Sequence, residues 1–522
     1  MDIPLRLSIL WMKLTSLLIY PLLIIHGAIF TPKKRLPPFV NCDLLTIPAT
    51  DLARKIRCRE IKSETVVKAY ISRIEAVNPL INAIVENGFD RAIEMAKIAD
   101  KKCMESEVSY LEEKYPLLGV PVTVKECCSL AGFPVTLGNY WRKNLRATEN
   151  SEVVQLILNA GAIPLLVSNT PEFCYSWESN NFITGRTLNP YDQRRIAGGS
   201  SGGEGALLGA GASLIGIAAD TGGSIRCPAM YNGVFGHKPT PGVLSLKGLL
   251  PDLSKTDAGN DYTTAGPMCR YAKDLSLLTK IMAGPRVISL KLDEPVPIED
   301  IKIFYKKNIG SSWFTIPTTR DVERTFDEVI QHFSDFGMKP VQLNLDLSLA
   351  PEYTVAGTAA LENIPSTLED PSGVHETPNL FLEILKSPFG CSKFTFASMY
   401  LMVLVKIATS FLFKKDIPRY MEHFDKMRND LLSLLSTNGV LLFLTMPTPA
   451  LRHHEYYTMW YGVAYPFIIN MLGFPAANIP IGFSSDGLPI GIQVIAGPYQ
   501  DRLCFSIAHH LERAFGGWKP PK

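Results

Sequence analysis

The sequence has little net charge and no long run of residues that carry charge of one sign. Its 522 residues contain 52 Lys and Arg against 50 Asp and Glu, which leaves a formal net charge of +2. It has no charge block, no internal repeat and no low-complexity linker. The balanced charge gives no electrostatic basis for binding nucleic acid, and the missing linker favours one large domain over several small ones.

Motifs for metals, disulfides and nucleotides are missing as well. The ten cysteines include no CxxC and follow no disulfide framework, so we expect buried free thiols. His453 and His454 have no partners at ligand spacing, so we predict no metal site. No Gly-Lys-Ser/Thr follows a glycine-rich loop, which argues against a phosphate cradle.

The apolar pattern predicts an α/β fold. Strand-like runs at residues 162–167, 214–219 and 490–495 occur among helical stretches such as 63–77 and 321–336. Such alternation is typical of a β-sheet with helices on both faces. We therefore expect a single α/β unit.

Glycine and serine gather between residues 196 and 226, where ten glycines occur. The segment from Asp220 to Ser224 follows a strand-like run, and Pro228 suits the first turn of a helix. A strand, a glycine turn and a helix start can aim consecutive backbone N–H groups into one concavity, as an oxyanion hole requires. Ser224 would attack a carbonyl at its mouth. The expected oxyanion donors are the amides of Thr221, Gly222, Gly223 and Ser224.

A serine nucleophile needs a base, and two candidates are present. His237 is the nearest histidine, but it has no acidic residue at motif spacing. Lys125 ends an apolar run of strand type, and alternation along a strand sends Lys125 and Glu126 to opposite faces. Because burial disfavours the charged form, we expect Lys125 to lose its proton readily and to act as the base.

Lys125, the block Gly-Gly-Ser-Ser-Gly-Gly at 198–203 and Ser224 in Gly-Gly-Ser-Ile-Arg together resemble the amidase signature family. Ser200 lies 75 residues after Lys125 and 24 before Ser224, as that family's relay requires. The resemblance implies that Lys125 is the base, Ser200 a proton shuttle beside a cis peptide, and Ser224 the nucleophile, with no cofactor. Ser201 is the weaker candidate for the shuttle.

Further blocks at residues 235–242, 266–275 and 487–498 extend this resemblance over nearly the whole chain. It implies a single amidase-signature domain with a large mixed β-sheet. Within the family, these sequence blocks are most similar to those of the fatty-acid amide hydrolases. That similarity implies cleavage of long-chain fatty-acid amides to a fatty acid and an amine through an acyl-enzyme on Ser224. It also places Cys174 and Tyr175 along the substrate channel.

Two apolar runs suggest contact with a membrane. Residues 14–30 carry no charge, and we expect a membrane anchor over residues 1–36, followed by the catalytic domain over 37–522. More basic residues follow this run than precede it, which favours a catalytic domain on the cytosolic face. A second run at 394–413, broken by Lys406, predicts a hydrophobic membrane cap over about 394–415 or an ordinary core helix. The expected partners are a lipid amide, a membrane and a second copy of the chain.

Three other functions stay open at this stage. Gly198-x-Ser200-x-Gly202 also fits the nucleophile elbow of an α/β-hydrolase esterase with a histidine base. A transamidase-type subunit of the same family would pass ammonia to a partner. A lipid-binding protein without activity would leave the three relay residues unused.

Overall fold

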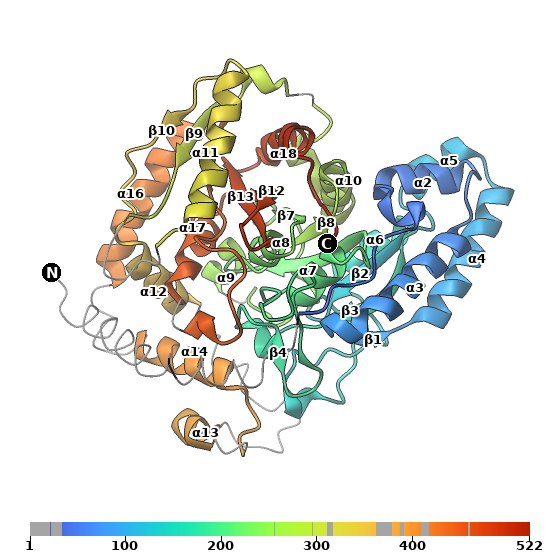
Figure 1. Cartoon of the computed structure of the whole chain (residues 1–522), viewed down its shortest axis with the longest axis horizontal. Coiled ribbons are helices and arrows are strands. Elements are labelled where there is room, and N and C mark those ends of the chain that lie inside the picture. Colours follow the sequence, from blue (N-terminus) through green and yellow to red (C-terminus); the bar gives the residue numbers. More distant parts are fainter. Residues whose placement is uncertain are drawn as a thin grey trace.

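The computed structural model describes residue 21 and residues 34–254, 256–294, 296–310, 317–361, 378–386, 391–408, 417–457 and 460–522. Its centre is a mixed sheet of eleven strands with helices around it (Figure 1). The α/β fold expected from the sequence is therefore confirmed. The expected anchor helix at 14–30 lies, apart from residue 21, outside the described residues.

The strands follow the order β1-β3-β2-β6-β8-β7-β12-β13-β11-β9-β10 across the sheet. Strands β3, β2 and β6 run parallel, as do β11, β9 and β10, and the remaining neighbours pair antiparallel. The strands of the sheet are β1 (Ile84–Asn87), β2 (Pro121–Lys125), β3 (Ile163–Ser168), β6 (Ile215–Asp220), β7 (Phe235–Lys238), β8 (Thr264–Cys269), β9 (Lys302–Lys306), β10 (Val341–Gln342), β11 (Gly439–Leu444), β12 (Ala476–Phe483) and β13 (Pro489–Ala496). A separate pair consists of β4 (Asn180–Asn181) and β5 (Gly185–Arg186).

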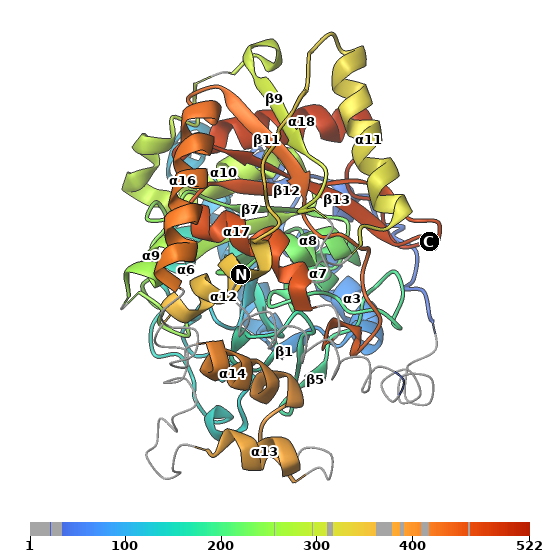
Figure 2. The ribbon, with the colours of Figure 1, turned by 90° about the vertical axis from the view of Figure 1, so that its left-hand side faces the viewer.

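Helices cover both faces of the sheet, with α10 and α18 on one side and α7, α8 and α17 on the other (Figure 2). The α-helices of the described residues are α2 (Ala49–Arg57), α3 (Ser63–Ile81), α4 (Phe89–Glu105), α5 (Val108–Lys114), α6 (Glu152–Asn159), α7 (Gly202–Gly209), α8 (Arg226–Tyr231), α9 (Asp257–Tyr262), α10 (Ala272–Ala283), α11 (Arg320–Asp335), α12 (Ala350–Ala360), α13 (Leu380–Lys386), α14 (Phe396–Ala408), α16 (Ile417–Leu435), α17 (Ala464–Leu472) and α18 (Asp501–Phe515).

Local sequence explains most of these elements. Strands β3 and β13 are buried along their whole length, so they read as continuous apolar runs instead of alternating ones. Helix α11 buries Val322, Phe326, Val329 and Phe333, which share one face at helical spacing. Helix α3 runs four residues further than expected, through Pro79, and the left-handed backbone of Asn82 ends it.

Two parallel neighbours bring the expected catalytic residues to one edge of the sheet. Strand β2 pairs with β6 in parallel, with Thr123 opposite Gly216 and Val124 opposite Ile217. Both strands end at this edge, β2 on Lys125 and β6 on Asp220, the residue before the glycine turn. Because parallel strands end on the same side, the turn and the lysine lie together.

Helices α13 and α14 extend away from the sheet at one end of the molecule (Figure 2). The apolar run at 394–413 forms α14 over Phe396–Ala408, with Met399 and Met402 buried against the protein and Lys406 exposed. Within the described residues no helix combines the length and the apolar character needed to cross a membrane.

Candidate functional site

Lys125 and Ser200 form the buried centre of the site. Lys125 Nζ donates a hydrogen bond to Ser200 Oγ at 2.7 Å, and a longer one to the carbonyl of Ala219 at 3.4 Å. The two side chains are 1% and 2% exposed. Glu126 does not share this environment, because its carboxylate accepts hydrogen bonds from the amide and hydroxyl of Thr136. The lysine therefore faces a serine hydroxyl instead of its neighbouring carboxylate.

Ser200 and Ser201 precede helix α7 and take different positions. The peptide bond between Gly199 and Ser200 is cis, as the family resemblance implied. The Ser201 amide donates to the backbone carbonyl of Ser224 at 3.2 Å, which joins the two serine segments. Ser201 Oγ is buried and does not reach Lys125, so Ser200 is the one of the two serines whose hydroxyl accepts a hydrogen bond from the lysine.

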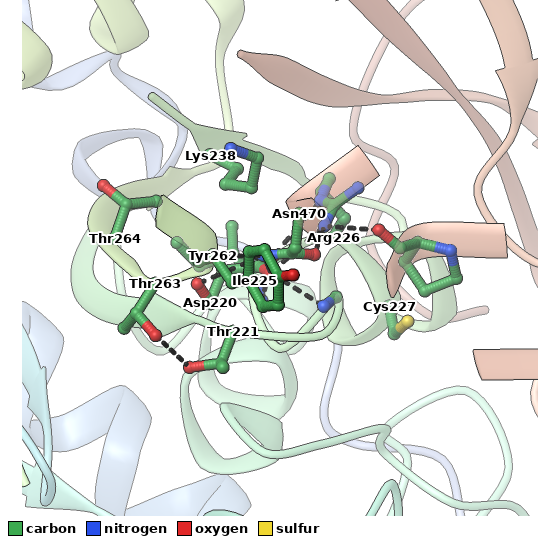
Figure 3. Close-up of polar contacts among 12 residues, drawn as sticks. Asp220, Thr221, Ile225, Arg226, Cys227, Lys238, Tyr262, Thr263, Thr264 and Asn470 are labelled. Carbon is green, nitrogen blue, oxygen red and sulfur yellow. Dashed lines mark hydrogen bonds and ion pairs between the residues drawn. The ribbon is translucent and has the colours of Figure 1, made fainter. Parts of the chain in front are cut away.

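The turn that carries Ser224 is held by a buried ion pair between its two ends. Asp220, the last residue of β6, binds Arg226, the first residue of α8, and both side chains are 0% exposed (Figure 3). Asp220 also accepts hydrogen bonds from the amides of Gly223 and Ile225. Burial alone raises the pKa of the Asp220 carboxyl, but Arg226 and the surrounding donors lower it well below its usual range.

Two distant residues complete this network. Asn470 on α17 accepts a hydrogen bond from Arg226 and donates one to Asp220 at 2.9 Å. Gln493 on β13 accepts from Arg226 at 2.7 Å. The turn is thus fixed both to its own strand and helix and to the far half of the sheet.

This network changes the expected oxyanion hole. The Gly223 amide is not free, because it donates a hydrogen bond to Asp220 Oδ1 at 2.7 Å. This hydrogen bond closes the turn between Asp220 and Gly223. Within the described part of the chain the amides of Thr221, Gly222 and Ser224 make no hydrogen bond. These three amides are the available donors for a developing oxyanion, and Gly223 serves the turn instead.

A cavity of about 170 Å³ brings the predicted site residues together. Lys125, Ser200 and Ser224 line it, as do Thr221, Gly222, Cys174 and Tyr175. Most of its wall is apolar and comes from the loop at 249–253, from helices α14 and α17, and from Leu361 and Val463 beside the ends of α12 and α17. The apolar wall residues are Leu249, Leu250, Pro251, Leu253, Leu361, Ala397, Leu401, Val463 and Phe467.

A buried carboxylate ties α14 to the segment of Cys174 and Tyr175. Glu172, in the 3-10 turn Glu172–Cys174, accepts hydrogen bonds from the amide and the hydroxyl of Thr395, at 2.8 Å and 3.0 Å. Thr395 directly precedes α14, so the carboxylate lies at the start of this helix. Burial raises the pKa of Glu172 to about 7. One side chain therefore positions two walls of the cavity.

The pKa of Lys125 departs from the expectation. Burial lowers the pKa of the ammonium, but Cys127, Cys174, Cys128 and Asp220 as anions raise it, and the net displacement is upward. Hydrogen bonding to Cys128 and burial raise the pKa of Cys127, and contact with Cys127 and burial raise that of Cys174. Both thiols are therefore uncharged near neutral pH, where Asp220 is the anionic neighbour of Lys125, and the thiols add to the upward displacement of its pKa only in alkali.

The histidine alternative does not fit this geometry. His237 bonds to Asp501 at 2.9 Å, and no histidine is among the described residues that line the cavity. His453 is buried and contacts Glu178 at 2.7 Å and the carbonyl of Gln193 at 2.8 Å. Neither histidine is in reach of Ser200 or Ser224 as a base.

Sequence reasoning missed several residues of the site. Asp220 and Arg226 flank the turn with a spacing that suggested no pairing, and Asn470 and Gln493 lie 244 and 267 residues from Arg226. Glu172 gave no signal beyond being a charge in an apolar stretch. Only Asp220 and Arg226, two charges beside a strand and a glycine turn, had a local pattern that could have indicated them.

Comparison with known proteins places this geometry among amide hydrolases. The Amidase family model matches residues 65–505. Fatty-acid amide hydrolase 2 of Homo sapiens is 38% identical over 511 residues, covering 96% of this chain and 94% of the relative. Fatty-acid amide hydrolase 2-B of Danio rerio is 40% identical over 504 residues, covering 94% and 93%. A solved structure of fatty acid amide hydrolase has a TM-score of 0.71 at 21% identity, covering 91% and 86%.

The buried ion pair predicts a large stability change on losing its cation. Arg226→Gln leaves Asp220 as an unpaired buried carboxylate, so we expect the free energy of unfolding at pH 7 to fall by about 3–5 kcal/mol. The loss in free energy of unfolding becomes smaller as the pH falls toward 4, because the unpaired Asp220 carboxyl then takes up a proton. Urea denaturation of the full chain measures both effects, and Arg324→Gln on the surface of α11 is the control. A loss below about 1 kcal/mol contradicts the role given to this pair.

Proposed function

Since the chain belongs to the amidase signature family of serine hydrolases, we propose that its substrates are long-chain fatty-acid amides, cleaved to a fatty acid and an amine. The observation that carries this proposal is the Lys125–Ser200 hydrogen bond opening onto the cavity that Ser224 lines. The apolar wall of that cavity supports an acyl chain as the part of the substrate that it holds.

Acylation begins with neutral Lys125. The lysine takes the proton of Ser200 while Ser200 takes that of Ser224, whose Oγ attacks the amide carbonyl. The amides of Thr221, Gly222 and Ser224 stabilise the oxyanion that forms. The same relay then returns a proton to the nitrogen, because an amine leaves poorly without one, and the acyl-enzyme on Ser224 results.

Deacylation uses the relay again. Water takes the place of the amine, Lys125 and Ser200 remove its proton, and attack on the ester of Ser224 releases the fatty acid. The Asp220–Arg226 pair lies beneath the turn and keeps its amides in place through both steps. In both steps the turn that carries Ser224 stays fixed, and only a proton moves between Lys125, Ser200 and the reacting group.

The relay predicts the direction of the pH dependence. Lys125 acts only when deprotonated, and the net displacement of its pKa is upward, so kcat/KM for a long-chain acyl amide should rise with pH through the alkaline range. Lys125→Ala should lower kcat by roughly 10⁴-fold, as removal of a relay member does in other serine hydrolases, and should abolish this rise.

The control for this prediction is Ser201→Ala, because Ser201 is a buried neighbour of Ser200 that does not contact Lys125. It should retain the rising pH profile of the unchanged protein. A Lys125→Ala protein with the same pH profile as the unchanged protein, whatever its rate, excludes Lys125 as the base.

Association with one leaflet of a membrane is the second part of the proposal. Helix α13 exposes Phe381, Leu382 and Leu385, with 68%, 50% and 53% of each residue accessible. It packs against α14, which lines the cavity with Ala397 and Leu401. An apolar helix of this kind can lie in the interface of a bilayer, and a lipid amide then reaches the cavity along α14.

Vesicle flotation tests this surface. Phe381→Glu combined with Leu385→Glu should reduce the fraction of protein that floats with phosphatidylcholine vesicles by about tenfold, because charge at these positions opposes burial in lipid. Ile98→Glu on α4, at the far side of the molecule, is the matched control, since Ile98 is 63% exposed (Figure 1). Equal flotation of both variants contradicts a membrane surface on α13.

A further inference from the structure

Two threonines face each other at the start of the nucleophile turn. Strands β6 and β8 pair antiparallel with Asp220 opposite Thr264, so Thr221 and Thr263 lie just beyond the end of this ladder. Their hydroxyls are 3.1 Å apart (Figure 3). Both residues line the cavity that holds Ser224. The sheet register therefore places a hydroxyl pair in the cavity that Ser224 also lines.

The pair retains hydrogen-bonding capacity for a ligand. Two hydroxyls carry two protons, and the contact between Thr221 and Thr263 uses one of them. No other hydrogen bond within the described residues involves either Oγ1. One proton and several lone pairs are thus left for a group in the cavity.

Other threonines of the cavity differ from this pair. On α12, Thr354 Oγ1 donates to the carbonyl of Ala350 at 2.8 Å, and Thr358 Oγ1 donates to that of Thr354 at 2.7 Å. Their protons are committed to the helix backbone. The α12 side of the cavity therefore presents no threonine proton to a substrate, whereas the Thr221 side does.

We infer that Thr221 and Thr263 form a subsite for a hydrogen-bonding group on the amine part of the substrate. This inference rests on the proposed function. An acyl chain has no polar atom, and covering the pair with methylene groups would leave a buried proton without an acceptor. The polar atoms of a fatty amide beyond the reacting group are on its amine. Thr221 also begins the turn that carries Ser224, and both residues line the cavity, so its hydroxyl is available to a group on the substrate near the amide.

A matched pair of substrates tests this subsite. The N-(2-hydroxyethyl) and N-propyl amides of one long-chain fatty acid differ by a hydroxyl in place of a methyl group. The unchanged protein should prefer the hydroxyethyl amide in kcat/KM by about tenfold, the value of one hydrogen bond to a buried partner. Thr263→Val and, separately, Thr221→Val should each bring the ratio of the two kcat/KM values close to one. Thr263→Ser should keep the preference.

Thr264→Val is the matched control, because Thr264 is adjacent and buried but its hydroxyl donates to the carbonyl of Ala265, and it does not line the cavity. It should leave the ratio unchanged. Cleavage of both amides with the same ratio in the unchanged protein and in both valine variants overturns the subsite alone. Cleavage of neither amide by the unchanged protein overturns the proposed function and the subsite with it.

Discussion

The ion pair between Asp220 and Arg226 is the interaction on which the rest of the site depends. It closes a turn of five residues between a strand and a helix, in surroundings that exclude water from both charges. Asp220 accepts hydrogen bonds from the Gly223 amide and from the Arg226 guanidinium at the same time, and together these bonds restrict the turn to one conformation. A buried pair of this kind adds little net stability, but it fixes geometry. Here it fixes the turn in which Thr221, Gly222 and Ser224 line the cavity, with their amides unbonded within the described residues.

The cavity that Ser224 lines has a polar floor and mostly apolar walls, and these come from different parts of the chain. Lys125, Ser200 and the nucleophile turn come from the ends of two parallel strands and the start of α7, all parts of the rigid centre. The walls come from α12, α14 and α17, later in the chain. Glu172 links the segment of Cys174 to α14. Its carboxylate accepts a hydrogen bond from the amide of Thr395, just before α14, and its own turn carries Cys174. In the function that we propose, catalytic chemistry and acyl-chain binding are thus assigned to different parts of the fold.

Much of the site was accessible from the sequence, since its signals are local. The apolar runs located β2 and β6, and the family resemblance carried by Lys125, Ser200 and Ser224 implied a single relay. In the structure all three residues line one cavity. The free Gly223 amide was a wrong expectation, because the conformation of the Asp220 side chain has no sequence signature. The direction of the Lys125 pKa also escaped prediction, since burial lowers it while Cys127 and then Cys174 raise it, and the balance of these effects depends on the fold. The membrane anchor and the homodimer stay predictions.

In the proposed reaction Ser224 attacks the amide and carries the acyl group. A long-chain fatty acyl p-nitroanilide mixed with the full chain and quenched in acid within one turnover should leave the acyl group on the protein. Peptide mass spectrometry then locates it. An acyl mass is expected on the peptide that contains Ser224, and none after Ser224→Ala. An acyl group on Ser200, or retained elsewhere in the Ser224→Ala protein, would contradict it.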